Sequence, residues 1–341
     1  MAYRGHKRDQ AFSLRRALQV LVLLCRTLFQ LPFSNVLYVT ISQSRLGFIK
    51  DAVPLFLARW LGKPAVAHLH GGNFSGFYET QPRGFQLLVR RALGRVSAIV
   101  VLADTFRNEF DMIPGGREKI QVIANPCEIE PLQERTAPSG TLRVLYLSNL
   151  VVEKGYLDVL AACSPLAQRL GTWKIEFHFA GAFALGRDDF ASVAAMEEDF
   201  ARRASAFGPT ASVQWHGVVD GEAKQLLLER CDVFVLPTYF INEGQPIALL
   251  EAMAVGLPVV ATRHRAIPET LPPEMSCLLV PTKDPGAIAD RLARLALTPG
   301  LYEACSRAAV LRAREFSPER YIGRLEAVLL DSVAKLGGSA N

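Results

Sequence analysis

EGQPIALLEAMAVGLPVVAT, residues 243–262, is the stretch that decides the fold. Pro246–Val255 is apolar nearly all round, which is typical of a buried helix, and its proline fits the first turn, where the missing N–H costs little. A short, continuously apolar run, Val259–Ala261, comes next, and such runs are typical of strands that helices cover on both faces. A buried helix followed by a buried strand predicts an α/β protein.

The same alternation of strands and helices extends through most of the chain. Short apolar runs predict strands at Val36–Ile41, Ala65–Leu69, Ala98–Leu102, Gln121–Ala124, Leu142–Leu147, Ile175–Ala180, Val213–His216, Val233–Leu236, Val259–Ala261 and Cys277–Val280. Helical patterns occupy Phe12–Leu31, Ser44–Leu61, Pro82–Leu93, Gly155–Leu170, Asp188–Ala206, Glu222–Arg230, Pro246–Val255, Pro285–Leu297, Gly300–Glu315 and Pro318–Lys335. Strands and helices that alternate at this spacing predict parallel sheets of the doubly wound type.

A polar linker divides the chain into two halves. The length of 341 residues favours two domains, at roughly 100–200 residues for each. The segment EIEPLQERTAPSGT, residues 128–141, is rich in Pro, Glu and Ser, and a new strand begins directly after it. We therefore expect an N-terminal domain over residues 1–135, a C-terminal domain over residues 141–316, and a closing helix over residues 317–337.

Composition excludes several classes of protein. Half of the residues are hydrophobic and 21% are charged, which excludes a disordered chain. The net charge of +5 fits a phosphate-bearing substrate or an anionic membrane surface, and is too small to indicate a nucleic-acid partner. The six cysteines are scattered without a CxxC pair, so we expect reduced, buried thiols and no zinc site. His68 and His70 are expected to point to opposite faces of their strand, and no metal site is predicted.

The N-terminus leaves two interpretations open. The apolar run Ala17–Phe33 is interrupted by polar residues, so it falls short of the ~20 apolar residues that a membrane span needs. The basic segment Arg4–Arg16 and this run lack the small-residue cleavage site of a signal peptide. Phe12–Leu31 therefore predicts an amphipathic helix that packs on a sheet, or one that also touches a membrane surface through Arg15 and Arg16.

Polar residues and glycines recur where the predicted strands end. Ligands of an open α/β sheet bind beyond the carboxyl ends of its strands. The residues found there are His70, Gly71, Gly72 and Asn73 in the first half, and Asn149, Lys154, Gly181, Gly217, Glu243, Gly244 and Gln245 in the second. Because both halves contribute, we expect one shared cleft.

Two glutamates flank the buried helix of the opening stretch. Glu251 is the only charge on that helix, and a buried carboxylate without partners costs several kcal/mol, so it needs ligand hydroxyls or protein donors. Glu243 lies just before the first turn, whose free N–H groups bind anions. Carboxylates that accept from sugar hydroxyls, beside amides that bind a diphosphate, suit a sugar nucleotide. The alternative is that Glu243 caps the helix and the backbone satisfies Glu251.

Two glutamates with seven residues between them resemble the signature of the retaining glycosyltransferases of family 4. Four further stretches resemble that family in its own order: residues 63–74 (KPAVAHLHGGNF), 99–129 (IVVLADTFRNEF to KIQVIANPCEI), 146–162 (YLSNLVVEKGYLDVLAA) and 213–244. Together they cover about residues 30–330. The resemblance implies a GT-B fold of two Rossmann-like domains that face a central cleft, with the closing helix crossing back to the first domain.

The resemblance also implies roles for single residues. His70 would line the active site near the transferring sugar, Lys154 would neutralise the donor diphosphate, and Glu243 would bind the donor sugar. These three are the expected catalytic residues. The expected donor-binding residues are Asn149, Gly181, Gly217, Gly244, Gln245 and Glu251, the last on the nucleotide ribose. Gly71, Gly72 and Asn73 are expected on the acceptor side, and neither a metal nor another cofactor is implied.

Two features of the sequence depart from the family. Asn149 stands where the family often has an arginine five residues before its lysine, so one positive charge on the diphosphate is lost. The family also normally opens with a strand and a glycine-rich loop, and no such pair precedes Val36–Ile41. We therefore expect the first βα unit of the N-terminal domain to be incomplete.

The function that follows is transfer of a hexose, with retention, from a UDP- or GDP-linked sugar to a saccharide or polyprenyl-linked acceptor. Its setting would be polysaccharide biosynthesis in the cytoplasm, at the inner face of the membrane. Two alternatives stay open: a catalytically impaired or truncated homologue that only binds, and another GT-B enzyme such as a sugar-nucleotide epimerase. A dehydrogenase and a serine hydrolase are disfavoured, because no GxGxxG follows a strand and GxSxG is absent.

Overall fold

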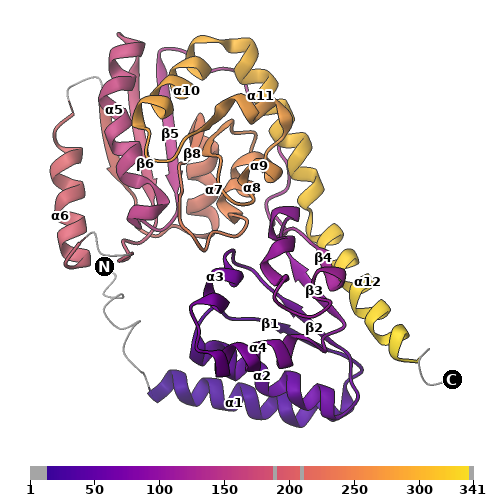
Figure 1. Cartoon of the computed structure of the whole chain (residues 1–341). Coiled ribbons are helices and arrows are strands. Elements are labelled where there is room, and N and C mark those ends of the chain that lie inside the picture. Colours follow the sequence, from indigo (N-terminus) through magenta and orange to yellow (C-terminus); the bar gives the residue numbers. More distant parts are fainter. Residues whose placement is uncertain (1–13, 187–189, 208–210, 338–341) are drawn as a thin grey trace. The chain divides into compact units, whose positions relative to one another are not determined.

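The computed structural model describes residues 14–186, 190–207 and 211–337. The basic segment Arg4–Arg16 lies mostly outside these ranges, as do Phe12 and Asp188, where the sequence predicts two helices to begin. The chain forms two compact units (Figure 1). Unit 1 holds the described residues up to Ala124 and those from Ile322 on, and unit 2 is Asn125–Tyr321.

Unit 1 is built on a four-stranded parallel sheet of order β1-β2-β3-β4. Its helix α2 packs on β1 and β2, and both α1 and α4 pack on α2 (Figure 1). Its elements are α1 (Leu14–Gln30), η1 (Leu31–Phe33), β1 (Leu37–Thr40), α2 (Arg45–Trp60), β2 (Ala65–His68), α3 (Phe74–Glu79), α4 (Arg83–Leu93), β3 (Ala98–Val101), η2 (Asp104–Phe110), η3 (Arg117–Lys119) and β4 (Ile120–Val122). Every residue of β2 and β3 is buried, so these two strands form the core of the sheet.

Unit 2 is built on a six-stranded parallel sheet of order β10-β9-β8-β5-β6-β7. Its strands are β5 (Thr141–Leu147), β6 (Lys174–Ala180), β7 (Ala211–Trp215), β8 (Val233–Leu236), β9 (Val259–Thr262) and β10 (Leu279–Val280). Its helices are η4 (Val152–Lys154), α5 (Tyr156–Leu170), α6 (Val193–Ala204), α7 (Gly221–Arg230), α8 (Ile247–Ala254), α9 (Ile267–Thr270), η5 (Pro273–Leu278), α10 (Pro285–Leu297), α11 (Pro299–Ala313) and η6 (Arg314–Phe316). The apolar helix α8 contacts β8, β9 and α11, and is buried from Leu249 to Ala254, as its composition predicts.

The α/β prediction is confirmed, and all ten predicted strands are present. The strand predicted over Cys277–Val280 is shorter, because η5 extends to Leu278. The helix predicted from Asp188 is described from Val193, where Ser192 caps it by accepting a hydrogen bond from the Ala195 N–H at 3.2 Å. The short helices α3 and α9 are not predicted, since each spans fewer than two turns.

Residues 125–135, which the sequence places with the N-terminal domain, group with unit 2. Three backbone N–H groups hold this segment there: Cys127 donates to the Phe316 carbonyl at 2.7 Å, Leu132 to the Ala254 carbonyl at 2.8 Å, and Arg135 to the Ser306 hydroxyl at 2.8 Å. The last helix, α12 (Pro318–Gly337), groups with unit 1 from Ile322 on. In the described ranges no helix is both long and apolar enough to cross a bilayer.

The six cysteines are free thiols. Four of them are buried, namely Cys127, Cys163, Cys231 and Cys305, whereas Cys25 is exposed and Cys277 is half-buried. Burial raises the pKa of the Cys127 thiol to about 11, so that thiol stays protonated and unreactive at neutral pH. The expectation of buried thiols is therefore wrong for Cys25, which lies on the exposed helix α1.

Candidate functional site

The loop that follows β5 packs directly against the loop that follows β8. Gly155, which ends the turn η4, adopts a φ of +81°, and a Cβ at this position would lie 2.4 Å from the carbonyl oxygen of Pro237. Only glycine fits both the left-handed backbone and the close contact. This approach brings Lys154, the last residue of η4, beside the residues that follow β8.

Lys154 and Glu243, which the sequence places at the ends of two different strands, form an ion pair. The Lys154 Nζ lies 3.5 Å from Glu243 Oε2, and the Thr238 hydroxyl donates to the same oxygen at 3.0 Å. Glu243 is nearly buried, whereas the Lys154 side chain is 22% exposed and lies 5.6 Å from the centre of the Phe240 ring. The lysine charge therefore stays accessible to an anion beside a carboxylate that is held in place.

The loop before α8 is fixed by Gln245. The Asn125 N–H donates to Gln245 Oε1 at 2.7 Å, its side-chain amide donates to the Gln245 carbonyl at 3.0 Å, and Gln245 Nε2 donates to the Thr270 hydroxyl at 3.2 Å. Gly244 is buried beside it. Since α8 has no side-chain cap and Glu243 bonds instead to Thr238, the alternative that Glu243 caps the helix is wrong.

Glu251 receives its donor from the protein. The side chain is 9% exposed, and Lys224 Nζ of α7 donates to Glu251 Oε1 at 2.5 Å. The alternative that the backbone satisfies Glu251 is therefore wrong, because its partner is a lysine side chain. Sequence reasoning missed Lys224. The sequence does indicate that a buried Glu251 needs a hydrogen-bond donor. It does not indicate that Lys224, 27 residues away, supplies that donor.

The ends of β5, β6 and β7 meet at two glycines. Gly181 adopts a φ of +140°, and a Cβ there would lie 2.0 Å from the Ser148 carbonyl oxygen. Its N–H donates to the Gly217 carbonyl at 2.7 Å, and its own carbonyl accepts from Trp215 Nε1 at 3.0 Å. Asn149 follows Ser148 and is exposed at the same strand end. Asn149, Gly181 and Gly217, three of the predicted donor-binding residues, thus lie on neighbouring loops at one edge of the sheet.

In unit 1, the end of β2 carries a stack of two histidine rings. The ring centres of His68 and His70 are 3.9 Å apart, so the prediction that they point to opposite faces is wrong: residues two apart on a strand share a face. His68 is fully buried, and its Nδ1 lies 2.5 Å from the Tyr38 hydroxyl. Burial and the nearby His70 lower the pKa of His68 to about 3, so its ring is neutral at physiological pH. Among the described residues, no group of three or more His, Cys, Asp or Glu side chains is placed to hold a metal ion.

The loop Gly71–Asn73 is held by a buried carboxylate that the sequence does not reveal. Glu109 of η2 accepts from the Asn73 N–H at 3.0 Å, and from the N–H and the hydroxyl of Ser75, both at 2.8 Å. Gln43 Nε2 donates to the Gly72 carbonyl, and Asn73 adopts a φ of +64°. The four predicted site residues from His70 to Asn73 thus lie on one loop at the end of β2, which Glu109 and Gln43 hold by hydrogen bonds.

Comparison with known proteins places the second sheet in a family. Residues 141–297 match the family described as Glycosyl transferases group 1. They belong to the group 1 glycosyltransferases. Asn149, Lys154, Gly181, Gly217 and the segment 243–251 lie inside this glycosyltransferase range, whereas the loop from His70 to Asn73 lies outside it. The resemblance inferred from the motifs is confirmed.

Two named relatives are similar to part of the chain. The chain is 27% identical over 215 residues to the putative colanic acid biosynthesis glycosyltransferase WcaL of Escherichia coli, covering 61% of this chain and 49% of WcaL. It is 32% identical over 184 residues to the amylovoran biosynthesis glycosyltransferase AmsK of Erwinia amylovora, covering 52% of this chain and 42% of AmsK. The chain therefore spans about half the length of these two relatives.

A solved structure shares the fold of most of the chain. HepE of Anabaena, in complex with UDP and glucose, matches with a TM-score of 0.70 and 17% identity, over 95% of this chain and 84% of that one. A likeness at this level of identity shows the fold alone. The predicted GT-B class, with its two parallel sheets, is confirmed.

Proposed function

We propose that the protein transfers a hexose from a nucleotide diphosphate sugar to a hydroxyl of a saccharide or polyprenyl-linked acceptor, with retention of configuration. The observation that carries this proposal is the ion pair of Lys154 and Glu243, 3.5 Å apart at the strand ends of a range that belongs to the group 1 glycosyltransferases. The retaining outcome follows the family resemblance of the motif that joins Glu243 and Glu251.

The donor would bind along the strand ends of unit 2. Glu251 would accept from the ribose hydroxyls, and the ion pair with Lys224 would hold that carboxylate in place. Lys154 and the free N–H groups of the first turn of α8 would bind the diphosphate. Glu243 would accept from hydroxyls of the donor sugar. UDP is the first nucleotide to test because HepE, which shares the fold, is solved with UDP and glucose.

The chemistry would be a front-face displacement. The acceptor hydroxyl attacks the anomeric carbon on the side from which the diphosphate leaves, and the departing phosphate oxygen takes the proton of that hydroxyl. Negative charge grows on the diphosphate, where Lys154 and the start of α8 stabilise it, and this electrostatic stabilisation supplies the main catalytic effect. His70, exposed and stacked on the neutral His68, would lie near the transferring sugar, with Gly71, Gly72 and Asn73 on the acceptor side.

The biological setting would be cell-surface polysaccharide biosynthesis. This part of the proposal rests on WcaL and AmsK, which are named for colanic acid and amylovoran biosynthesis. Such a reaction would take place in the cytoplasm, with the N-terminal basic helix at the inner face of the membrane.

The test is turnover of UDP- and GDP-hexoses, measured as nucleotide release with simple hexosides as acceptors. Lys154→Ala is expected to reduce turnover on the order of 100-fold or more, as when one donor to a developing oxyanion is removed. Glu243→Ala is expected to reduce turnover as well, because the donor sugar loses an acceptor for its hydroxyls. Matched controls are Lys174→Ala and Glu229→Ala, which remove the same charges from exposed positions of unit 2. Near-normal turnover in the first pair contradicts the assignments. An epimeric sugar or sugar nucleotide formed without an acceptor identifies an epimerase instead.

A further inference from the structure

Helix α1 is apolar and yet hardly buried. Its sequence, LRRALQVLVLLCRTLFQ, is dominated by aliphatic residues, but none of its described side chains is buried. Leu18 is 60% exposed, Leu23 59% and Phe29 76%. A surface helix normally turns such residues toward a core, and large exposed apolar patches mark interaction sites. Within the described residues, nothing buries the apolar side chains of α1.

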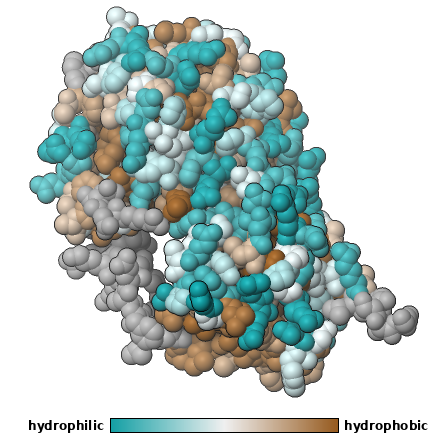
Figure 2. All heavy atoms as spheres, viewed as in Figure 1, coloured by the Kyte–Doolittle hydropathy of each residue, from teal (hydrophilic) through white to brown (hydrophobic). Residues whose placement is uncertain are grey.

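The outer face of α2 continues this apolar surface. On its inner face Phe48, Ala52 and Leu55 are buried, as expected of a helix that packs on a sheet. The outer face of α2 carries exposed apolar side chains where a surface helix normally has polar ones. They are Leu46, Ile49, Val53 and Trp60, which are spaced three to seven residues apart. We define the α1–α2 face by its exposed apolar residues: Leu18, Leu21, Val22, Phe29, Phe33, Leu46, Ile49, Val53 and Trp60. The lower edge of Figure 2, where Figure 1 draws α1, is correspondingly brown.

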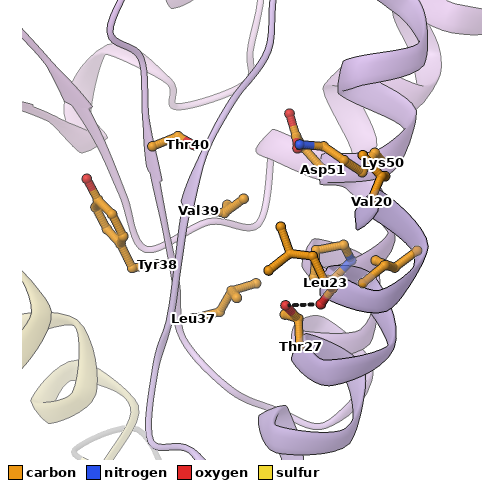
Figure 3. A pocket seen from close by; sticks show the side chains of 11 residues that line it. Val20, Leu23, Thr27, Leu37, Tyr38, Val39, Thr40, Lys50 and Asp51 are labelled. Carbon is orange, nitrogen blue, oxygen red and sulfur yellow. Dashed lines mark hydrogen bonds and ion pairs between the residues drawn. The ribbon is translucent and has the colours of Figure 1, made fainter. Parts of the chain in front are cut away.

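A pocket beneath α1 shows that this helix is also loosely packed on its inner side. The pocket, of about 270 Å³, lies between α1, β1 and α2 and is lined mainly by aliphatic residues, among them Val20, Leu23 and Leu37 (Figure 3). At one end Lys50 lies 2.9 Å from the buried carboxylate of Asp51. Both sides of α1 therefore offer apolar surface, and the one acidic group at the pocket is already paired with a lysine.

The net positive charge around the α1–α2 face indicates which kind of partner would bind there. Residues 14–98 contain eleven Lys and Arg but only two Asp and Glu, against 38 and 33 in the whole chain. The cations of the three helices are Arg15, Arg16 and Arg26 in α1, Arg45, Lys50 and Arg59 in α2, and Arg83, Arg90 and Arg91 in α4. A second copy of the chain would bring the same positive charges together, which disfavours self-association through this face. An apolar surface bordered by cations is complementary to anionic lipid headgroups.

We propose that the α1–α2 face docks on the surface of an anionic bilayer. Helix α1 lies in the plane of the headgroups, with Phe29 and the Trp60 ring of α2 inserted among the acyl chains and Arg26, Arg45 and Arg59 on the phosphates. This mode fits a chain in whose described part no helix can span a membrane. It deepens the proposed function, on which it rests for its purpose, namely transfer to a lipid-linked acceptor.

The test is co-sedimentation of the full chain with vesicles. We expect binding to vesicles that contain phosphatidylglycerol, weaker binding to pure phosphatidylcholine, and release at high salt. The charge variant Arg45→Gln with Arg59→Gln is expected to bind phosphatidylglycerol vesicles about 25-fold more weakly, at roughly fivefold for each cation. The apolar variant Leu46→Ser with Trp60→Ser is expected to lose on the order of tenfold or more.

Matched controls remove the same groups from unit 2. Leu297→Ser, at a position 56% exposed, and Arg202→Gln with Arg203→Gln in α6 are expected to leave vesicle binding unchanged. Circular dichroism checks that each variant folds. Equal sedimentation of the wild type and both face variants overturns the proposal, and so does a dimer in light scattering that the apolar variant dissociates.

Nucleotide binding separates this proposal from the proposed function. Calorimetry with UDP and GDP is expected to give the same affinity for the wild type and the face variants. Vesicle binding without any nucleotide binding refutes the proposed function and leaves the docking face standing. Nucleotide binding without vesicle binding refutes the docking face and leaves the proposed function standing.

Discussion

Glu109 is expected to hold the loop at the end of β2, and its removal gives the sharpest test of unit 1. Its carboxylate is 6% exposed and accepts two backbone N–H groups and one hydroxyl, at 2.8–3.0 Å. Hydrogen bonds to a charged group contribute roughly 1.5–3 kcal/mol each, and a buried donor left unsatisfied costs about 1–3 kcal/mol. We therefore expect Glu109→Ala to lower the free energy of unfolding by about 3–5 kcal/mol, and Glu109→Gln by about 1–2 kcal/mol.

Two measurements check this expectation. Thermal unfolding of Glu109→Ala is expected to shift downward by about 10 °C, at roughly 2–4 °C for each kcal/mol in a unit of this size. Amide hydrogen exchange is expected to accelerate at Asn73 and Ser75, whose N–H groups lose their acceptor. Glu118→Gln, which alters an exposed acid of η3, serves as the control and should change neither. A loss below about 0.5 kcal/mol, the scatter of ordinary surface substitutions, together with unchanged exchange refutes the role given to Glu109.

Three further predictions follow from single contacts. Gly155→Ala is expected to cost about 2–4 kcal/mol in urea unfolding, because the new Cβ meets a carbonyl oxygen at 2.4 Å. Gly62→Ala, with a φ of +64° and nothing within 4 Å of the new Cβ, should cost only about 1–2 kcal/mol, and equal costs argue against the close approach at Gly155. Lys224→Met is expected to weaken the binding of UDP about tenfold and that of 2′-deoxy-UDP much less, whereas Lys224→Arg should bind UDP nearly as the wild type does. Calorimetric affinities that do not change in Lys224→Met contradict the role of the Lys224–Glu251 ion pair. Burial lowers the pKa of His68 from 6.5 to about 3, so the unfolded chain takes up this proton first and stability is lost as pH falls from 6.5 to about 3. His68→Gln should remove that loss of stability, which amounts to about 1.4 kcal/mol for each unit by which the pKa is lowered. If the variant and the wild type lose stability equally between pH 6.5 and 3, the buried His68 ring is not the cause of the loss.

The fold was predictable because its signal is local. Each strand is a short apolar run, and each long helix has an apolar face, so type and order follow from neighbouring residues. The end of η5 at Leu278 and the cap of α6 at Ser192 depend on backbone hydrogen bonds, which apolar patterning does not reveal. The linker over residues 128–141 is polar, yet residues 125–135 group with unit 2 because their N–H groups bond there.

The candidate site was predictable only in part, for a different reason. Glu243 and Lys154 stand out because charges at strand ends of a parallel sheet converge, and the structure brings them together. Lys224 and Glu109 do not stand out, since each meets its partner across 27 to 36 residues and nothing in its own neighbourhood marks it. Candidate ligand-binding residues can be predicted from their place at the ends of strands. The residues that hold them in position can be identified only once the structure shows which side chains meet.

The affinity of the wild-type protein for UDP and GDP, measured by calorimetry, tests the central claim most directly. If unit 2 is the donor-binding half of a group 1 glycosyltransferase, one of these nucleotides binds with one site per chain, and Lys154→Ala and Glu251→Ala each weaken it at least tenfold, consistent with the loss of one charge-assisted contact. If the folded protein binds neither nucleotide, or if both variants bind as tightly as the wild type, the claim is contradicted.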